Sequence, residues 1–221
     1  GVAYMAEFTR RYAPATVRLK ELIATQLGPP HLLFCHHRAR TRSRARRPEG
    51  PRGQGPMRRM MELVDWCCYV VGQNPTSVLG TGQQATDGGG RESYRALSLD
   101  FSANGQEGRG PLAQISVGSY LTARWPEAVS YRPPAHLQVC CQRGVACVDL
   151  PSTVVWFDQA GRHLESLESE RPASQQLLMR FHRAVTSLVR KQSDLEDAFR
   201  AQQIVLTARQ AHREGRRLPI R

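Results

Sequence analysis

Four segments of the chain place apolar residues at helical spacing. The first ends at Gly28, which two prolines follow, and the second runs from about Met57 to Val71 and ends at Gly72. The other two close the chain, and Ser193 with Glu196 forms a capping box at the start of the last. The apolar faces contain, in order, Leu19, Leu22, Ile23 and Leu27; Met60, Met61, Leu63, Val64, Cys67, Cys68 and Val71; Leu177, Leu178, Phe181, Val185 and Leu188; and Ala198, Ala201, Val205 and Ala208.

The second helix also carries a polar stripe opposite its apolar face. The members of the stripe stand at i, i+4, i+7 and i+11, so they share one side of the helix: Arg58, Glu62, Asp65 and Tyr69.

Elsewhere, apolar and polar residues alternate as they do in half-buried strands. This pattern predicts strands in GVAYM (1–5), HLLFCHH (31–37), YRALSLDFS (94–102), with Ser98 and Asp100 on the polar side, and LAQISVGSY (112–120). HLQVCC and VACVDL flank a turn at 142–144, and TVVWF leads into a turn at 158–161, so hairpins follow. We therefore expect an α+β fold, with a mostly antiparallel open sheet and helices packed on one face.

The net charge of +12 is concentrated in one tract of the chain. Residues 38–59 hold nine arginines and one glutamate, which together supply +8. Because the tract has no apolar face to bury, we expect a flexible loop over residues 38–57. The tract could neutralise phosphates of a nucleic acid without specificity, but it has no aromatic residue for base stacking. Arginine makes up 29 of the 31 basic residues, a bias that GC-rich coding would also produce.

The six cysteines include two adjacent pairs and no C-x-x-C spacing. Neighbours on a strand face opposite ways, so Cys140 and Cys141 do not suit one metal, and Cys35-His36-His37 fits a strand better than a ligand set. We interpret the thiols as typical of a reducing compartment. No apolar run approaches the roughly 20 residues of a membrane span, and no signal peptide is apparent, so we expect a cytoplasmic protein without metal or membrane.

Residues 80–85 match the dinucleotide fingerprint G-x-G-x-x-A after a possible strand. A phosphate-binding fingerprint must lead into a helix, whose N-terminus meets the pyrophosphate. Thr86, Asp87 and three glycines follow instead, so the sequence argues against a cofactor site here.

Several collinear segments resemble the glucose-fructose oxidoreductase/inositol dehydrogenase (Gfo/Idh/MocA) family. RYAP (11–14), RLKELI and LGPP resemble the end of its nucleotide-binding domain, and ELVDWCCYVVGQNPTSV (62–78) resembles its central helix. The stretch from HLQVCC to the C-terminus resembles its closing hairpins and helices. The resemblance implies a Rossmann remnant with its last strand and helix over 1–28, containing Arg11 as a cofactor-binding residue, and a substrate-binding and dimerisation domain over 29–221.

The chain departs from the family at the catalytic positions. The family's E-K-P lysine has no counterpart here, since Lys20 and Lys191 stand in other settings. Its central helix presents Asp, His and Asp, with the His as acid/base, and Arg58, Glu62 and Asp65 hold these places. Only Asp65 matches. We predict these three as the catalytic-site residues, because a glutamate can accept a hydroxyl proton in suitable surroundings; the alternative is a solvated i, i+4 Arg–Glu pair.

Three functions remain open at this point. The first is the substrate part of an NAD- or NADP-dependent oxidoreductase for a polyol, a sugar or a related hydroxylated compound, forming homo-oligomers through the sheet face and lacking most of the cofactor domain. The second is a catalytically silent structural or binding relative, and the third is non-specific nucleic-acid binding through the Arg-rich tract. In each case we expect this chain alone to bind no nicotinamide cofactor and to be inactive.

Overall fold

The computed structural model describes residues 5–40, 54–84, 92–103, 106, 108–121, 127, 135–186 and 193–220. The chain begins with a 3₁₀ turn η1 (Thr9–Tyr12), helix α1 (Pro14–Leu22) and a π-helical turn η2 (Ile23–Leu27). Strand β1 (Pro30–Arg40) precedes helix α2 (Gln54–Val71). The remaining elements are β2 (Ser77–Gln84), β3 (Glu92–Asp100), β4 (Leu112–Leu121), β5 (Leu137–Cys141), β6 (Gly144–Asp149), β7 (Thr153–Asp158), β8 (Gly161–Ser166), α4 (Ala173–Thr186), α5 (Ser193–Glu214) and β9 (Leu218–Pro219).

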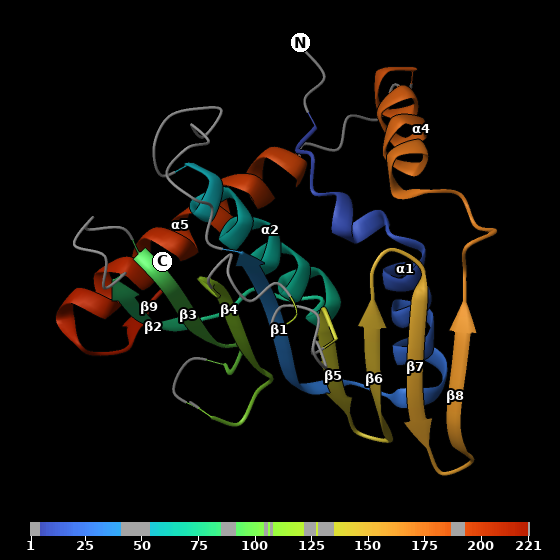
Figure 1. Ribbon diagram of the computed structural model, residues 1–221, viewed down its shortest axis with the longest axis horizontal. Helices are drawn as coiled ribbons and strands as arrows, with labels where there is room; N and C mark the ends of the chain where they lie inside the picture. The colour runs from blue at the N-terminus through green and yellow to red at the C-terminus, as the bar shows by residue number, and fades with distance from the viewer. Residues whose placement is uncertain are drawn as a thin grey trace.

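The strands form one sheet in the order β8-β7-β6-β5-β1-β4-β3-β2-β9. Only the β1–β4 pair is parallel among the described strands, and every other neighbour runs antiparallel. The expected hairpins β5–β6 and β7–β8 are both present. The predicted α+β class with a mostly antiparallel open sheet is confirmed (Figure 1).

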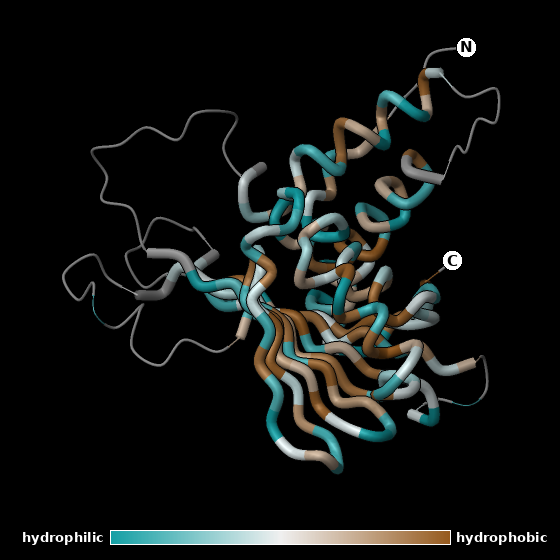
Figure 2. The backbone as a smooth tube through the Cα atoms, turned by 90° about the vertical axis from the view of Figure 1, so that its right-hand side faces the viewer, coloured by the Kyte–Doolittle hydropathy of each residue, from teal (hydrophilic) through white to brown (hydrophobic). Residues whose placement is uncertain are grey.

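The helices lie on one face of this sheet (Figure 2). Helix α1 packs on β6 and β7, α2 on β1 and β4, and α5 on β2, and α2 and α5 also pack against each other. Side chains that point to the helices form the buried core, whereas those on the opposite face are mostly half-buried. One cross-strand row on that open face runs from β2 to β8: Leu79, Ser98, Gln114, Phe34, Gln138, Cys147, Val155 and Leu164.

Several expected boundaries move. Strand β1 extends to Arg40 and α2 begins at Gln54, so both ends of the predicted 38–57 loop are regular structure, and residues 41–53 lie outside the described residues. The expected N-terminal strand falls on residues 1–5, of which only Met5 is described, and Met5 is in no strand. Asp100, which we expected on the polar side of its strand, is buried. Its carboxylate accepts hydrogen bonds from the backbone of Ser102 and Gly108 and from Arg217, and these donors compensate the burial of its charge.

The predicted apolar stripe on α4 is present but exposed. None of its described residues is buried, and Leu178 and Val185 are 67% and 56% exposed. In Figure 1, α4 stands beyond the sheet and next to the N-terminal segment, where it contacts η1. The helix therefore contributes little to the core of the described part of the chain.

The backbone of helix α5 contacts β2 at Gly80. A Cβ atom at this position would lie 2.1 Å from the backbone carbonyl oxygen of Ala208. Side chains cannot relieve this overlap, since the opposing atom belongs to the backbone. Glycine at position 80 thus sets the distance between α5 and the sheet.

We predict that Gly80→Ala destabilises the protein by about 3 kcal/mol, the upper end of the range for overpacking. Gly55→Ala is the matched control, because nothing lies within 4 Å of a Cβ there and alanine suits a helix. Urea unfolding of the two variants and the wild type measures the difference. Equal stability of Gly80→Ala and Gly55→Ala would contradict the close contact.

Candidate functional site

The polar stripe on α2 divides into a buried half and an exposed half. Asp65 is 2% exposed, whereas Arg58 and Glu62 reach the surface, with side chains 66% and 24% exposed. The sequence alone placed the three residues on one side of the helix, which is correct, but it did not show this division. The two halves make different contacts, and their chemistry differs accordingly.

Asp65 forms a buried ion pair with Arg11. The guanidinium donates from Nε to Asp65 Oδ2 at 2.7 Å and from Nη2 to Asp65 Oδ1, and its Nη1 donates to Asp197 Oδ2 on α5 at 2.9 Å. Burial lowers the pKa of Arg11, but the hydrogen bonds and charges of the two aspartates outweigh it and raise the pKa above its ordinary value. Arg11 thus joins η1, α2 and α5, and each of its three guanidinium nitrogens donates to a carboxylate of the protein. The role of Arg11 in cofactor binding stays a prediction.

Glu62 belongs to a chain of ionic contacts at the surface. Arg58 donates from Nε to Glu62 Oε1 and from Nη2 to Glu7 Oε2, each at 3.1 Å. The i, i+4 Arg–Glu pair weighed as the alternative is therefore present. Because Glu62 keeps one oxygen without a described hydrogen bond to Arg58, the pair leaves it able to accept another donor.

Arg10 lies close enough to Glu62 for their charges to interact. The sequence alone did not identify it as a site residue. Its guanidinium stacks 5.1 Å from the ring centroid of Trp66, whose Nε1 donates to Thr16 Oγ1 at 3.0 Å. Burial lowers the pKa of Arg10, while Cys35 and Glu62 counteract this effect. The Nη1 of Arg10 is buried without a hydrogen-bond partner in the described part of the chain. A buried donor of this kind usually has a partner, so its place in the core is a cost to the fold.

His37 at the end of β1 lies next to this group. Arg59 Nη1 is 2.8 Å from His37 Nε2, which fits a neutral imidazole that accepts a hydrogen bond. Burial, Arg59 and Arg10 lower the pKa of His37 from 6.5 to about 4. Glu62, Arg10, His37 and Arg59, which we call the α2–β1 cluster, therefore bring one carboxylate together with two guanidiniums and a neutral imidazole.

The structure also describes most of the glycine motif at 80–85 and the histidines and cysteines considered as metal ligands. Gly80 and Gly82 lie inside strand β2, which runs to Gln84, so this segment forms no phosphate-binding turn that leads into a helix. No group of His, Cys, Asp or Glu side chains in the described ranges could hold a metal ion. All six cysteines are free thiols, and burial raises the pKa of Cys68 to about 12 and that of Cys141 to about 11. No helix of the described chain is long and apolar enough to cross a membrane.

Solved structures share this arrangement of sheet and helices. An oxidoreductase from Desulfitobacterium hafniense, proposed to depend on NADPH, superposes with a TM-score of 0.78 at 15% identity over 100% of this chain. Levoglucosan dehydrogenase, solved with NADH and levoglucosan, superposes with a TM-score of 0.75 at 12% identity over 99% of this chain. Aldose-aldose oxidoreductase from Caulobacter crescentus, solved with glycerol, superposes with a TM-score of 0.74 at 13% identity over 97% of this chain.

The chain has the fold of these oxidoreductases. The predicted resemblance is thereby confirmed at the level of the fold. This chain spans 63% to 67% of the length of the three proteins. The sequence matches no protein-family model and no curated protein.

The neutral state of His37 predicts a pH dependence of stability. Its pKa of about 4 in the folded chain lies below the ordinary value of 6.5, so the unfolded chain takes up the proton first. Stability is therefore unaffected by His37 above pH 6.5, falls as the pH drops below this value, and levels off near pH 4.

Urea midpoints of the wild type and His37→Gln at pH 7 and at about pH 5 test this expectation. The wild type should lose more stability than the variant between the two pH values, because glutamine accepts the Arg59 hydrogen bond but does not titrate. Equal losses in the two proteins would show that His37 is not held neutral by its surroundings.

Proposed function

We propose that this chain is the substrate-binding part of an oxidoreductase that uses NAD or NADP to oxidise or reduce a sugar, a polyol or a related hydroxylated compound. The fold supports this class, since levoglucosan dehydrogenase and aldose-aldose oxidoreductase share it. The observation that carries the proposal is Glu62, a part-exposed carboxylate beside the buried guanidinium of Arg10 on the stripe where the resemblance implies the acid/base residue.

Glu62 is the proton-transfer group in this proposal. Its carboxylate would accept the proton of a substrate hydroxyl, and the hydrogen bond from Arg58 Nε would hold the carboxylate in position. Arg10 would add positive charge near Glu62, and the Arg59–His37 pair would bound the site on the β1 side. Asp65 would act as a positioning residue, because both of its oxygens already accept hydrogen bonds from Arg11.

The nicotinamide cofactor would supply the hydride acceptor or donor. The β2 segment does not fit a pyrophosphate, so the cofactor would be held by a nucleotide-binding domain outside the described residues. The exposed apolar stripe of α4, beside η1, would pack against that domain. The open sheet face, with Phe34, Val155 and Leu164 in one row, would form the contact between two copies of the protein.

A catalytically silent relative is the second candidate. The Glu7–Arg58–Glu62 chain supports it, because Arg58 stands where the resemblance implies an aspartate and is already paired on both sides. Non-specific nucleic-acid binding stays a hypothesis, since most of the Arg-rich tract falls on residues 41–53, outside the described part. Turnover in a reconstructed enzyme separates the first two candidates.

We expect Glu62→Gln to lower turnover by about a hundredfold or more when this chain is joined to an intact nucleotide-binding domain, the usual scale for a positioned proton-transfer group. The measurement is steady-state turnover on polyol and sugar substrates, with circular dichroism to confirm folding. Glu21→Gln, which removes an exposed carboxylate paired with Arg18, is the control and should keep full turnover.

Two outcomes contradict the catalytic role. Unchanged turnover in Glu62→Gln would exclude Glu62 as the acid/base group. Absence of turnover in the reconstructed wild type, despite bound cofactor, would favour the silent relative.

A further inference from the structure

The open face of the sheet has an apolar half. Over strands β8, β7, β6, β5 and β1 most side chains on this face are apolar or thiols, and Phe157 and Leu164 are 45% and 62% exposed. Monomeric proteins rarely expose a continuous apolar patch of more than a few hundred square ångströms, so such a face is typical of a contact surface. The side chains stand in two cross-strand rows that we call the apolar half: Leu164, Val155, Cys147, Gln138 and Phe34 in one row, and Arg162, Phe157, Val145, Cys140 and Leu32 in the other.

Toward strands β4 and β3 the same face becomes polar. Gln114 Nε2 donates to Ser98 Oγ at 3.0 Å, and His36 Nδ1 lies 2.9 Å from Ser116 Oγ. These polar side chains already form hydrogen bonds across the strands, so a partner that covered them would have little to add. Burial is favourable on the apolar half, because a partner there removes apolar area from water.

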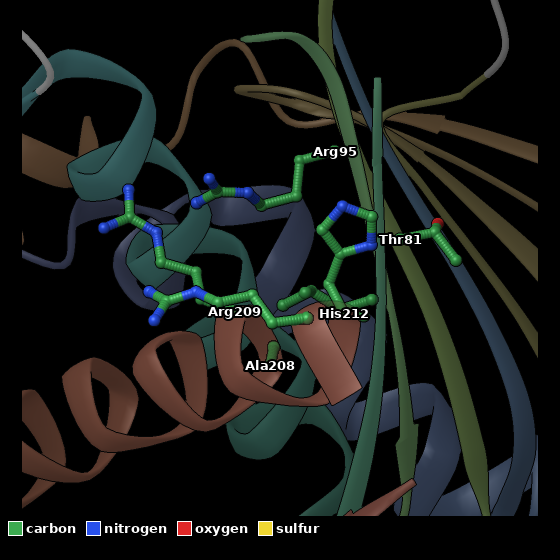
Figure 3. A pocket seen from close by; sticks show the side chains of 8 residues that line it. Thr81, Arg95, Ala208, Arg209 and His212 are labelled. Carbon is green, nitrogen blue, oxygen red and sulfur yellow. The ribbon is translucent and has the colours of Figure 1, made fainter. Parts of the chain in front are cut away.

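Helices occupy the other face of the sheet. A pocket of about 210 Å³ lies there between α5 and strands β2 and β3, and Arg95 and Arg209 line it (Figure 3). Both arginines already interact with other groups of the protein, so the pocket is part of the packing of α5 on the sheet. The open face is therefore the side of the sheet on which a second molecule can pack.

Two thiols lie at the centre of the apolar half. Cys140 of β5 and Cys147 of β6 are half-buried, and their register places them as diagonal neighbours on adjacent strands. Diagonal neighbours have Cα atoms about 7–8 Å apart, which a disulfide cannot span without a backbone shift. The remaining thiols lie on α2 or on strands with their side chains directed at the helices: Cys67, Cys68, Cys35 and Cys141. A thiol of the open face therefore has a disulfide partner only in a second chain.

A two-fold axis between β5 and β6 accounts for both features. In a two-fold contact, a pair of residues occurs twice, with the roles of the two copies exchanged. Such an axis lays strands β8 to β4 of one copy over strands β4 to β8 of the other, so it covers the apolar half and leaves β3 and β2 outside. It also places Cys140 of one copy near Cys147 of the other, across the roughly 10 Å that separates two packed sheets.

The overlap is large enough for a stable contact. The six strands from β8 to β4, about 4.8 Å apart and about 20 Å long, cover a flat area of roughly 600 Å², and the relief of the side chains increases the accessible area. Stable interfaces bury about 800 Å² on each partner. A second copy of this chain therefore suits the face, whereas a small ligand would leave most of it exposed.

We propose that two copies of this chain pack through the apolar half about this axis, and that a disulfide between Cys140 of one copy and Cys147 of the other joins them covalently under oxidation. The inference rests on the sheet-face contact of the proposed function, and it adds the position of the axis and a response to thiol oxidation. It shares no residue with the α2–β1 cluster, so the turnover of Glu62→Gln does not decide it.

Glutathione disulfide is the oxidant in this reaction. A thiolate of one copy attacks one of its sulfurs, the S–S bond breaks, and one glutathione leaves as the thiolate. A thiolate of the second copy then attacks the protein sulfur of the mixed disulfide and releases the second glutathione. The two cysteines lose two electrons and two protons, and the glutathione disulfide is reduced to two thiols. Burial and Asp149 raise the pKa of Cys147, so we expect faster exchange at about pH 8 than at about pH 7.

Sedimentation velocity of the reduced 221-residue chain tests the contact. We expect a dimer, and Leu164→Asp should raise its Kd by at least about tenfold, because it places a charge in the apolar half of each copy. Leu178→Asp on α4 is the matched control, since this leucine is 67% exposed but lies outside the sheet. A monomeric wild type, or an equal loss in the two variants, would overturn the inference together with the sheet-face contact.

Non-reducing electrophoresis after incubation with glutathione disulfide tests the thiols. We expect the wild type to form a covalent dimer that dithiothreitol cleaves, and Cys140→Ser and Cys147→Ser each to lose it. Cys141→Ala is the matched control and should form the dimer as the wild type does, because Cys141 is next to Cys140 in sequence but is directed at the helices. A covalent dimer in either serine variant, or none in a dimeric wild type, would contradict the disulfide and leave the sheet-face contact standing.

Discussion

The helix layer of this protein depends on one guanidinium that cannot be left unpaired. Arg11 lies on the 3₁₀ turn before α1 and holds Asp65 of α2 and Asp197 of α5, residues 54 and 186 positions away. Asp65 is almost fully buried, so its charge would be costly without a partner, and its two oxygens fix the orientation of α2 about its own axis. Because α2 and α5 pack against each other over the sheet, the ion pair also fixes how the two helices lie relative to η1.

The Arg11–Asp65 ion pair also determines which residues of the α2 stripe can contact a ligand. With Asp65 paired to Arg11, Glu62, one turn away on α2, lies toward the surface. There Arg58 pairs with it and Arg10 lies near it, and Arg10 in turn lies near the His37–Arg59 pair. The same layer brings the backbone of α5 onto β2 at Gly80. One helix packing arrangement therefore positions both the α2–β1 cluster and the close contact between α5 and the sheet.

The fold was largely predictable from sequence, whereas the sites were predictable only in part. Alternation in YRALSLDFS and LAQISVGSY, and the turns at 142–144 and 158–161, predict the strands because one face of this sheet is buried. The stripe on α2 followed from helical spacing in the same way. The pairing of Arg11 with Asp65 and the stacking of Arg10 on Trp66 join distant segments, and no local pattern encodes them. The apolar stripe of α4 shows a further limit of local patterns. Its spacing predicts an apolar face, but it does not predict which part of the protein covers that face.

A double-mutant cycle on Arg11 and Asp65 tests the central role of the ion pair most directly. Arg11→Met keeps the aliphatic stem, Asp65→Asn keeps the shape, and urea unfolding gives the free energy of each variant. We predict that each single change costs about 3 kcal/mol, because it removes one charge of the buried Arg11–Asp65 pair and leaves the other, and that the double variant costs little more than either, with a coupling of about 2 kcal/mol or more. Additive losses, with a coupling below about 0.5 kcal/mol, would show that the helix layer does not depend on this pair.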